Sequence, residues 1–331
     1  MAKELAKQCG GARVRGCEGA LVLCLGLCVV LSLSGALAAQ GMFARDTPKG
    51  AGAKTWLERK AKLPAFTPPR LADGKPNLQG RWGGSWSGDV IEETEYIDVT
   101  TPPFESWIAD PADGRIPYQP WALAERDSYR ANLARGWPGE TGNRLFMDPQ
   151  TFCLKNVPRY SQRGFELVQT SGYVVQMLNW GHYHRRIPLD ARARPASTAK
   201  FWMGIPRGRW DGDTLVVEST NFNGKMWLDS VGNFYTENAR ITERFRLVEA
   251  NTIDYEVTID DPTAFTRPWK LNAAIRRQGT GGGGGGGNTP NAKPDPYAVE
   301  SWEHACHEGN FNHIKGAQDL GFKWYPGARR P

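Results

Sequence analysis

The central part of the chain alternates apolar and polar residues with a period of two, which is typical of strands that bury one face. The clearest case is a pair of runs at 241–247 and 253–259, joined by a turn at 249–251. Many short strands with polar outer faces, and no helical pattern between them, favour an antiparallel all-β fold, either a barrel or a sandwich. The other runs with strand character lie at 78–82, 165–169, 173–179, 214–220 and 269–275.

Two segments break this pattern. Residues 120–135 have the apolar spacing of an amphipathic helix, and Pro120 suits a first helical turn, so we expect a helical excursion between early strands. Residues 281–287 are seven consecutive glycines, which predict a flexible linker. A phosphate-binding loop is not indicated, because neither a strand-to-helix context nor a following Lys-Ser/Thr pair accompanies the glycines.

These features divide the chain into five predicted parts. The segment after the glycines has the pattern of a short helix and an irregular turn, and we expect it to dock on the barrel. The parts are a signal peptide at 1–38, an extended N-terminal arm at 39–77, the β-barrel or sandwich domain at 78–280, the glycine-rich linker at 281–296, and the C-terminal segment at 297–331.

The first 38 residues have the three regions of a secretory signal peptide. A start with four basic side chains precedes an almost wholly apolar run at 20–33, and Ala36-Leu37-Ala38 supplies a small-x-small cleavage pattern. The alternative is an uncleaved membrane anchor, but an apolar run of about 14 residues is short against the roughly 20 needed to cross a bilayer. We therefore expect a periplasmic or secreted protein without stable membrane insertion after cleavage.

Cleavage would change the cysteine count. Four of the six cysteines lie in the predicted signal peptide, and only Cys153 and Cys306 remain. Two cysteines in an exported chain most economically form one disulfide. The alternative is a free nucleophilic Cys306, which an oxidising compartment disfavours.

Charge and motifs exclude some classes of partner. The formal net charge is +6, and it falls to about +4 without the signal peptide, which holds four basic and two acidic residues. The arginines are scattered along the chain, so nucleic-acid binding has little support. Neither nucleotide nor flavin binding is indicated by any motif, and we expect no cofactor.

Glu243 is the strongest single carboxylate candidate. It lies in phase with Ile241 and Phe245, so the alternation points it toward the apolar side of its strand. A buried carboxylate needs a partner, and Arg185 or Arg267 would supply one. Two roles stay open: a structural ion pair inside the barrel, and general acid or base chemistry.

The five histidines fall in two short clusters, which suggests two halves of one site. Two imidazoles two residues apart share a face of a strand and form a familiar pair of metal ligands. If alternation continued unbroken from the preceding strand, Arg185 would share a face with Met177, although Gly181 could carry a bulge that changes this phase. The zinc-protease order is absent, and solvated or hydrogen-bonded histidines are the alternative, so we expect no metal. The clusters are His182 with His184, and His304 with His307 and His313.

Aromatic side chains offer a second kind of site. Several tryptophans lie on or beside the predicted strands, where they would either fill a core or line a cavity for a flat apolar ligand. Core filling is the commoner role of such residues. The ligand-binding candidates are Trp82, Trp180, Trp202, Trp269 and Asn221.

Several stretches together resemble a large, functionally uncharacterised family of exported bacterial proteins. They read HYHRRIPLD at 182–190, GRWDGDTLVVESTNF at 208–222, TERF at 242–245, DDPTAFTRPW at 260–269 and ACHEGN at 305–310. The resemblance places His182 and Arg185 on a family pattern and gives His184 no counterpart. Gly80-Arg81-Trp82 is also similar to the Gly-x-Trp opening of lipocalin-like barrels.

Two functional hypotheses follow. The first is an exported binding protein for a small apolar or aromatic molecule, with His182, Arg185, Glu243 and Glu308 as polar contacts. The second is a hydrolase, lyase or isomerase. In that case His182 or His307 would be the general base and Arg185 would stabilise negative charge, while Glu243 or Glu308 would orient the imidazole. A fold of this type hosts both roles, so the sequence does not choose between them.

Overall fold

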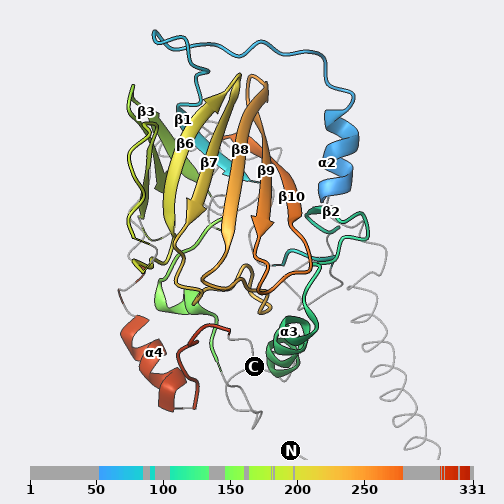
Figure 1. The fold of residues 1–331 in the computed structure, drawn as a ribbon, viewed down its shortest axis with the longest axis vertical. Helices are drawn as coiled ribbons and strands as arrows, with labels where there is room; N and C mark the ends of the chain where they lie inside the picture. Colours follow the sequence, from blue (N-terminus) through green and yellow to red (C-terminus); the bar gives the residue numbers. More distant parts are fainter. Residues whose placement is uncertain are drawn as a thin grey trace, which may run out of the picture. The chain divides into compact units, whose positions relative to one another are not determined.

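The computed structural model describes residues 52–84, 90–93, 105–133, 146–159, 164–179, 181, 183–196, 198–278, 306, 308, 310–319 and 321–328. The predicted signal peptide and the glycine run lie outside these residues. Within the described residues, the strands form one antiparallel sheet that curls into a nearly closed barrel, which confirms the expected all-β class (Figure 1). The strands are β1 (Gly80–Gly84), β2 (Ile108–Asp110), β3 (Phe165–Gln169), β4 (Tyr173–Leu178), β5 (His184–Pro188), β6 (Ile205–Asp211), β7 (Thr214–Thr220), β8 (Arg240–Glu249), β9 (Thr252–Asp260) and β10 (Trp269–Arg277).

The sheet order is β5-β4-β3-β1-β10-β9-β8-β7-β6, and the short strand β2 pairs with β10 outside this path. The long hairpin of β8 and β9 sets the register, with Ile241 opposite Ile259 and Phe245 opposite Tyr255. All four side chains are buried, as are Glu243 and Val257 midway between them, while residues 242, 244, 256 and 258 lie on the opposite, more exposed face. The alternation in the sequence therefore became an inner apolar face and an outer charged face, as period-two patterning requires.

The barrel is nearly closed where the two end strands, β5 and β6, approach each other without a backbone ladder between them. Gly208 of β6 makes this approach possible. A Cβ atom at this position would lie 2.8 Å from Cγ2 of Ile187 and 2.8 Å from Cδ2 of Leu189. Any larger residue would therefore push the edges of the seam apart.

The contacts of Gly80 and Trp82 give a physical reason for the Gly-x-Trp pattern. Trp82 is fully buried and donates its indole N–H to the carbonyl of Leu78 at 2.8 Å. The guanidinium carbon of Arg277, on the last strand, lies 4.1 Å from the centroid of the Trp82 ring. A Cβ atom at Gly80 would lie 2.7 Å from Nη1 of Arg277, so only glycine leaves room for this stacking. The contact joins the first and last strands through a cation–π interaction.

Helices lie outside the strand ladder. They are α2 (Ala53–Lys60), α3 (Pro120–Leu133), α4 (Asn310–Asp319) and the short 3-10 helix η2 (Pro149–Phe152). Helix α3 confirms the predicted excursion and begins at the expected proline. In the part of the chain that the structure describes, none of the helices is long and apolar enough to cross a membrane.

Helix α2 differs from our expectation of an extended arm. Its eight residues include alanine, leucine, glutamate, arginine and lysine, all good helix formers. Ala53 and Trp56 are buried on one face of the helix. Arg59 and Lys60 occupy the last turn, where their positive charges interact favourably with the negative end of the helix dipole. The burial of Ala53 and Trp56 stabilises this helix in the folded protein. Eight residues are too few for the apolar spacing to predict a helix from the sequence.

A buried polar network holds the loop after β7. The carboxylate of Asp229 accepts hydrogen bonds from the backbone N–H of Ile91 at 3.2 Å and from the side chain of Asn233 at 2.6 Å. Arg126 of α3 binds Glu92 at 2.7 Å and donates to Asn233 at 3.4 Å. Burial raises the pKa of Asp229, and the hydrogen bonds it accepts oppose that rise. The network ties the loop, α3 and residues 90–93 together.

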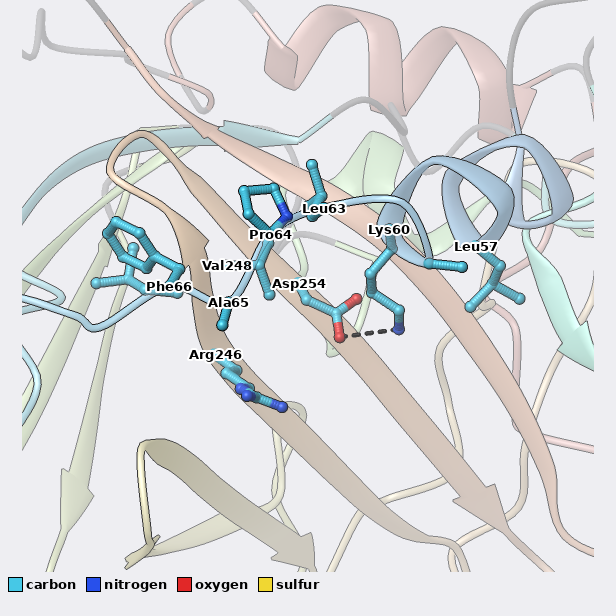
Figure 2. Close-up of a pocket in the computed structure, with 11 residues that line it drawn as sticks. Leu57, Lys60, Leu63, Pro64, Ala65, Phe66, Arg246, Val248 and Asp254 are labelled. Carbon is cyan, nitrogen blue, oxygen red and sulfur yellow. Dashed lines mark hydrogen bonds and ion pairs between the residues drawn. The ribbon is translucent and has the colours of Figure 1, made fainter.

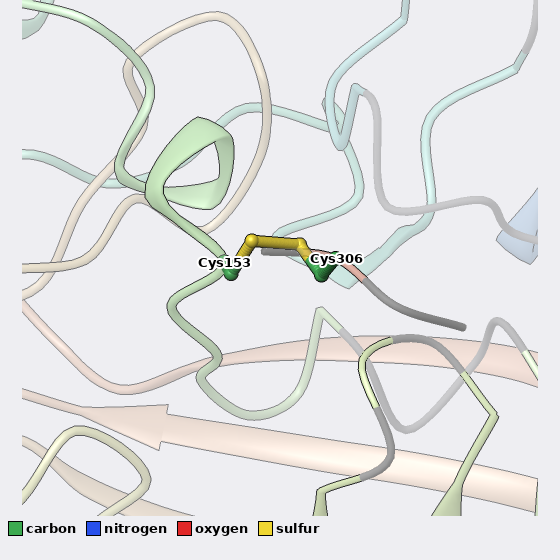
Figure 3. Close-up of a disulfide and its surroundings, with 2 residues drawn as sticks. All are labelled: Cys153 and Cys306. Atoms are coloured by element: carbon green, nitrogen blue, oxygen red, sulfur yellow. A yellow bond between two sulfur atoms is a disulfide. The ribbon is translucent and has the colours of Figure 1, made fainter. Parts of the chain in front are cut away.

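Cys153 and Cys306 form a disulfide, which confirms the predicted pairing (Figure 3). Cys153 follows η2, and the bond joins it to a segment 153 residues further along the chain. Near the C-terminus, Trp324 stacks on Phe152 of η2 with ring centroids 3.6 Å apart. Tyr325 is buried and packs its ring 5.7 Å from that of Trp227. Covalent and aromatic contacts thus hold the C-terminal segment to the same region.

We expect the Cys306→Ser variant to lose on the order of 2–5 kcal/mol of unfolding free energy, because opening so long a loop restores entropy to the unfolded chain. Urea denaturation followed by tryptophan fluorescence measures this loss. The Cys153→Ser/Cys306→Ser double variant is the control, and its stability should match that of either single variant, since all three lack one and the same bond. A single variant as stable as the oxidised wild type would contradict the prediction.

Candidate functional site

A charged pair lies inside the barrel. Arg185 of β5 and Glu243 of β8 form an ion pair in which Arg185 is 2 % exposed and Glu243 is fully buried. Their strands are not neighbours in the sheet, because β6 and β7 lie between β8 and the seam with β5. The pair therefore connects side chains across the interior, and not along one strand ladder. Of the two predicted partners of Glu243, the structure selects Arg185.

Arg185 is fixed by three side chains. One terminal nitrogen, Nη2, donates to Glu243 and to the hydroxyl of Ser219 at 2.9 Å. The other, Nη1, donates to the amide oxygen of Gln176 at 3.2 Å. Gln176 is opposite Arg185 on the neighbouring strand β4. A planar guanidinium held at both terminal nitrogens has one orientation, so these contacts define the direction of its Nε–H.

Glu243 has no free carboxylate oxygen for proton transfer. Its Oε2 atom accepts from Arg185, and its Oε1 atom accepts from the hydroxyl of Tyr255 at 2.6 Å. Tyr255 is 1 % exposed and comes from the adjacent strand β9. With each oxygen engaged by a buried donor, the carboxylate serves to hold Arg185 in place.

Two buried donors in this cluster lack an acceptor among the described residues. They are the Nε atom of Arg185 and the Nε2 atom of Gln176. Both residues are almost completely buried, with exposed fractions of 2 % and 0 %. Leaving a buried donor unsatisfied costs about 1–3 kcal/mol, so such groups mark places where an acceptor of another kind is expected.

A second group of polar side chains comes from the segment after η2. Lys155 is 1 % exposed and packs its stem against Gly181, where a Cβ atom would lie 2.9 Å from its Cε. Asn156 donates to the backbone carbonyl of Trp227 at 3.0 Å, and the hydroxyl of Tyr235 donates to the backbone carbonyl of Val157 at 3.4 Å. Burial raises the pKa of Tyr235, and the charges of both Arg185 and Glu243 act on it in opposite directions. The phenol therefore stays neutral near the ion pair.

The segment that carries Lys155 is itself held rigidly. Arg159 is fully buried and grips the carboxylate of Asp148 with two parallel hydrogen bonds of 2.9 and 2.8 Å. A bidentate pair of this kind adds geometric precision as well as energy. The disulfide at Cys153 anchors the same segment from its other side.

The structure separates the other predicted polar candidates from this cluster. Arg267 lies on the surface and binds Asp110 at 2.9 and 3.0 Å, so it is not the partner of Glu243. His184 is exposed on the outer face of β5, opposite the outward-facing Met177. Glu308 is exposed on the C-terminal segment. His182, His304, His307 and Trp180 lie outside the described residues, and of His313 only the backbone is described.

The phase of β5 corrects the expectation of unbroken alternation. Arg185 shares the inner face with Gln176 and not with Met177. The reason is the turn between the two strands, where Gly181 adopts a φ of +72°. That left-handed conformation reverses the chain and resets the phase, as the alternative reading of Gly181 had allowed.

The aromatic candidates take different positions. Trp82 and Trp269 are fully buried in the main hydrophobic core, whereas Trp202 is 36 % exposed. Asn221 adopts a φ of +61° and donates both amide hydrogens to the backbone carbonyls of Ala196 and Ala199, each at 3.0 Å. Its side chain therefore ties down the loop before β6.

Sequence reasoning missed three members of the cluster, and Lys155 of the second group. Gln176 and Ser219 each occupy a buried position within an apolar face, between Val174 and Leu178 on β4 and after Val217 on β7. A polar residue in phase with buried ones was the available signal. Tyr255 was placed on the inner face without a role, and Lys155 lies in a loop that carries no periodic pattern.

No family model, curated protein or solved structure matches this chain. Within the described residues, no group of three or more histidine, cysteine, aspartate or glutamate side chains could hold a metal ion. The site is therefore interpreted from its own geometry.

We expect Glu243→Gln to lower the unfolding free energy by about 3–5 kcal/mol, because it leaves the buried Arg185 charge without a counter-ion. Denaturant titration measures the loss. Glu218→Gln is the matched control, since Glu218 binds Arg194 and Arg240 on the surface and should contribute less than about 1 kcal/mol.

Removing both charges should restore part of that loss. The double variant Arg185→Met/Glu243→Leu replaces the pair by apolar residues of similar volume, and it should be more stable than Glu243→Gln. If Glu243→Gln were no less stable than the surface control, the pair would not be the buried constraint described above.

Proposed function

We propose that the protein is an exported binding protein that receives a small molecule inside the barrel, at Arg185 and Gln176. The observation that carries this proposal is the pair of buried donors that lack an acceptor among the described residues, Arg185 Nε and Gln176 Nε2. A ligand with acceptor oxygens, such as a carboxylate, would supply the hydrogen-bond partners that these donors lack. The surrounding inner positions are apolar, for example Leu178, Leu215 and Val257, and favour an apolar or aromatic body.

Binding fits the geometry better than hydrolase, lyase or isomerase chemistry. General acid or base catalysis needs a titratable group with a free position toward the substrate. Both oxygens of Glu243 accept hydrogen bonds from Arg185 and Tyr255, and the exposed Glu308 offers no buried carboxylate. A guanidinium fixed by its neighbours, with its Nε–H still available, is suited to recognising an acceptor.

Two further features support the wider proposal. The Cys153–Cys306 disulfide is a bond of oxidising compartments, in agreement with the signal-peptide pattern of the first 38 residues. The Gly-x-Trp segment, which resembles the opening of lipocalin-like barrels, lies on β1 of this barrel, and small barrels of this kind can enclose a small ligand.

The test compares wild type with Gln176→Met, which removes the amide donor but keeps the side-chain length. Protein purified from an oxidising export compartment is analysed by native mass spectrometry, and bound molecules are extracted and identified. We expect a co-purifying molecule on the wild type and about tenfold weaker rebinding by Gln176→Met, the effect of one hydrogen bond to a bound group.

Met177→Leu is the control, because Met177 lies next in the chain but faces outward. It should bind the extracted molecule like the wild type. A wild-type protein that carries no molecule, and whose melting temperature no aryl or alkyl carboxylate raises, would overturn the proposal.

A further inference from the structure

A groove lies on the outer surface of the barrel, beneath the N-terminal arm. It has a volume of about 500 Å³ and is formed by the end of α2, the extended residues that follow it, and the outer faces of β8 and β9 (Figure 2). Three lining residues are charged, namely Lys60, Arg246 and Asp254, and the others are apolar. Leu57, Leu63 and Phe66 are half-buried along its wall.

The charges of this groove are arranged unusually. Asp254 and Arg246 are opposite each other in the β8–β9 register, where oppositely charged side chains normally pair. Instead, two residues of helix α2 bind Asp254. Lys60 forms an ion pair with Asp254 at 3.0 Å, and the indole N–H of Trp56 donates to the same carboxylate at 2.9 Å. Asn272 adds a third hydrogen bond at 3.1 Å.

Arg246 is consequently left without a carboxylate partner among the described residues. It is exposed at the wall of the groove, as Figure 2 shows. The other carboxylates of the surrounding strands and turns are also bound elsewhere. Asp211 pairs with Arg244, Asp213 with Arg70 and Glu249 with Arg59.

We propose that this groove is a binding site for an amphipathic small anion, in which Arg246 binds the anionic head and the arm covers an alkyl or aryl body. The charge of the lining favours an anion, because Lys60 and Asp254 neutralise each other and Arg246 adds one positive charge. The apolar wall formed by Leu57, Leu63 and Phe66 favours a hydrocarbon body. A guanidinium recognises carboxylate, sulfonate and phosphate heads through paired hydrogen bonds.

The groove is separate from the barrel interior. On β8, Glu243, Phe245 and Leu247 point inward and are buried, whereas Arg244 and Arg246 lie on the opposite face. A ligand at Arg246 therefore does not contact Arg185 or Gln176. The proposal stands or falls independently of the function proposed for the interior.

The test uses decanoate as the probe and isothermal titration calorimetry as the measurement. We expect wild type to bind decanoate in this groove, and Arg246→Gln to bind it there about tenfold more weakly because a charge-assisted hydrogen bond is lost. Arg244→Gln is the matched control: it is on the same face of the same strand, two residues away, and should keep wild-type affinity. Unchanged thermal unfolding of the variants will show that they are folded.

A second probe tests the charge of the head group, and a second variant tests whether the site is separate from the interior. Decyltrimethylammonium has the same chain with a positive head, and it should not bind detectably. In the background of the interior variant Gln176→Met, Arg246→Gln should still weaken decanoate binding about tenfold, which separates this site from the interior one.

Three results would overturn the proposal: no binding of decanoate by the wild type, equal affinity in Arg246→Gln, or equal binding of the cationic probe. Sedimentation with phosphatidylglycerol vesicles, without binding of dissolved decanoate, would also overturn it. In that case Arg246 would contact a membrane surface and not a single-chain anion.

Discussion

The ion pair between Arg185 and Glu243 constrains the whole barrel, because two opposite charges removed from water must stay in contact. The strand order ends at β5 on one side and β6 on the other, and no backbone ladder closes this seam. Arg185 comes from β5, while Glu243 and Ser219 come from β8 and β7 on the far side of the seam. Side-chain hydrogen bonds thus join the two edges from inside. Gly208 allows the same edges to touch from the wall.

The same constraint shows how much of the site the sequence predicts. The clean alternation of β8 placed Glu243 on the inner face and required a buried cation for it. The choice between Arg185 and Arg267 could not be made, since it depends on the turn at Gly181, which resets the phase of β5. Local pattern specifies which face a residue occupies within its own strand, but a left-handed turn breaks that inference at the next strand.

Other parts of the structure also differ in how far the sequence predicts them. Strand β6 carries Pro206, Gly208 and Arg209, so its composition resembles a loop, and only pairing with the β-branched strand β7 makes it a strand. The disulfide was predictable by elimination, because only Cys153 and Cys306 remain once the predicted signal peptide is removed. Lys155 gave no signal, because its burial results from packing against Gly181 and not from any periodicity.

The charged residues on the inner and outer faces of β8 and β9 differ in how they are paired, and this difference is relevant to function. Inside, Glu243 is fully engaged and serves to hold Arg185. Outside, Asp254 is engaged by Lys60, Trp56 and Asn272, and Arg246 has no carboxylate partner among the described residues. Stability does not explain the inner pair, since apolar residues of similar volume are often neutral or stabilising in place of a buried ion pair. Nor does it explain the two buried donors that have no acceptor within the described part of the chain, each of which lowers stability. The proposed recognition of a ligand oxygen would account for both features at once, because it requires an N–H that is fixed in direction and available to the ligand.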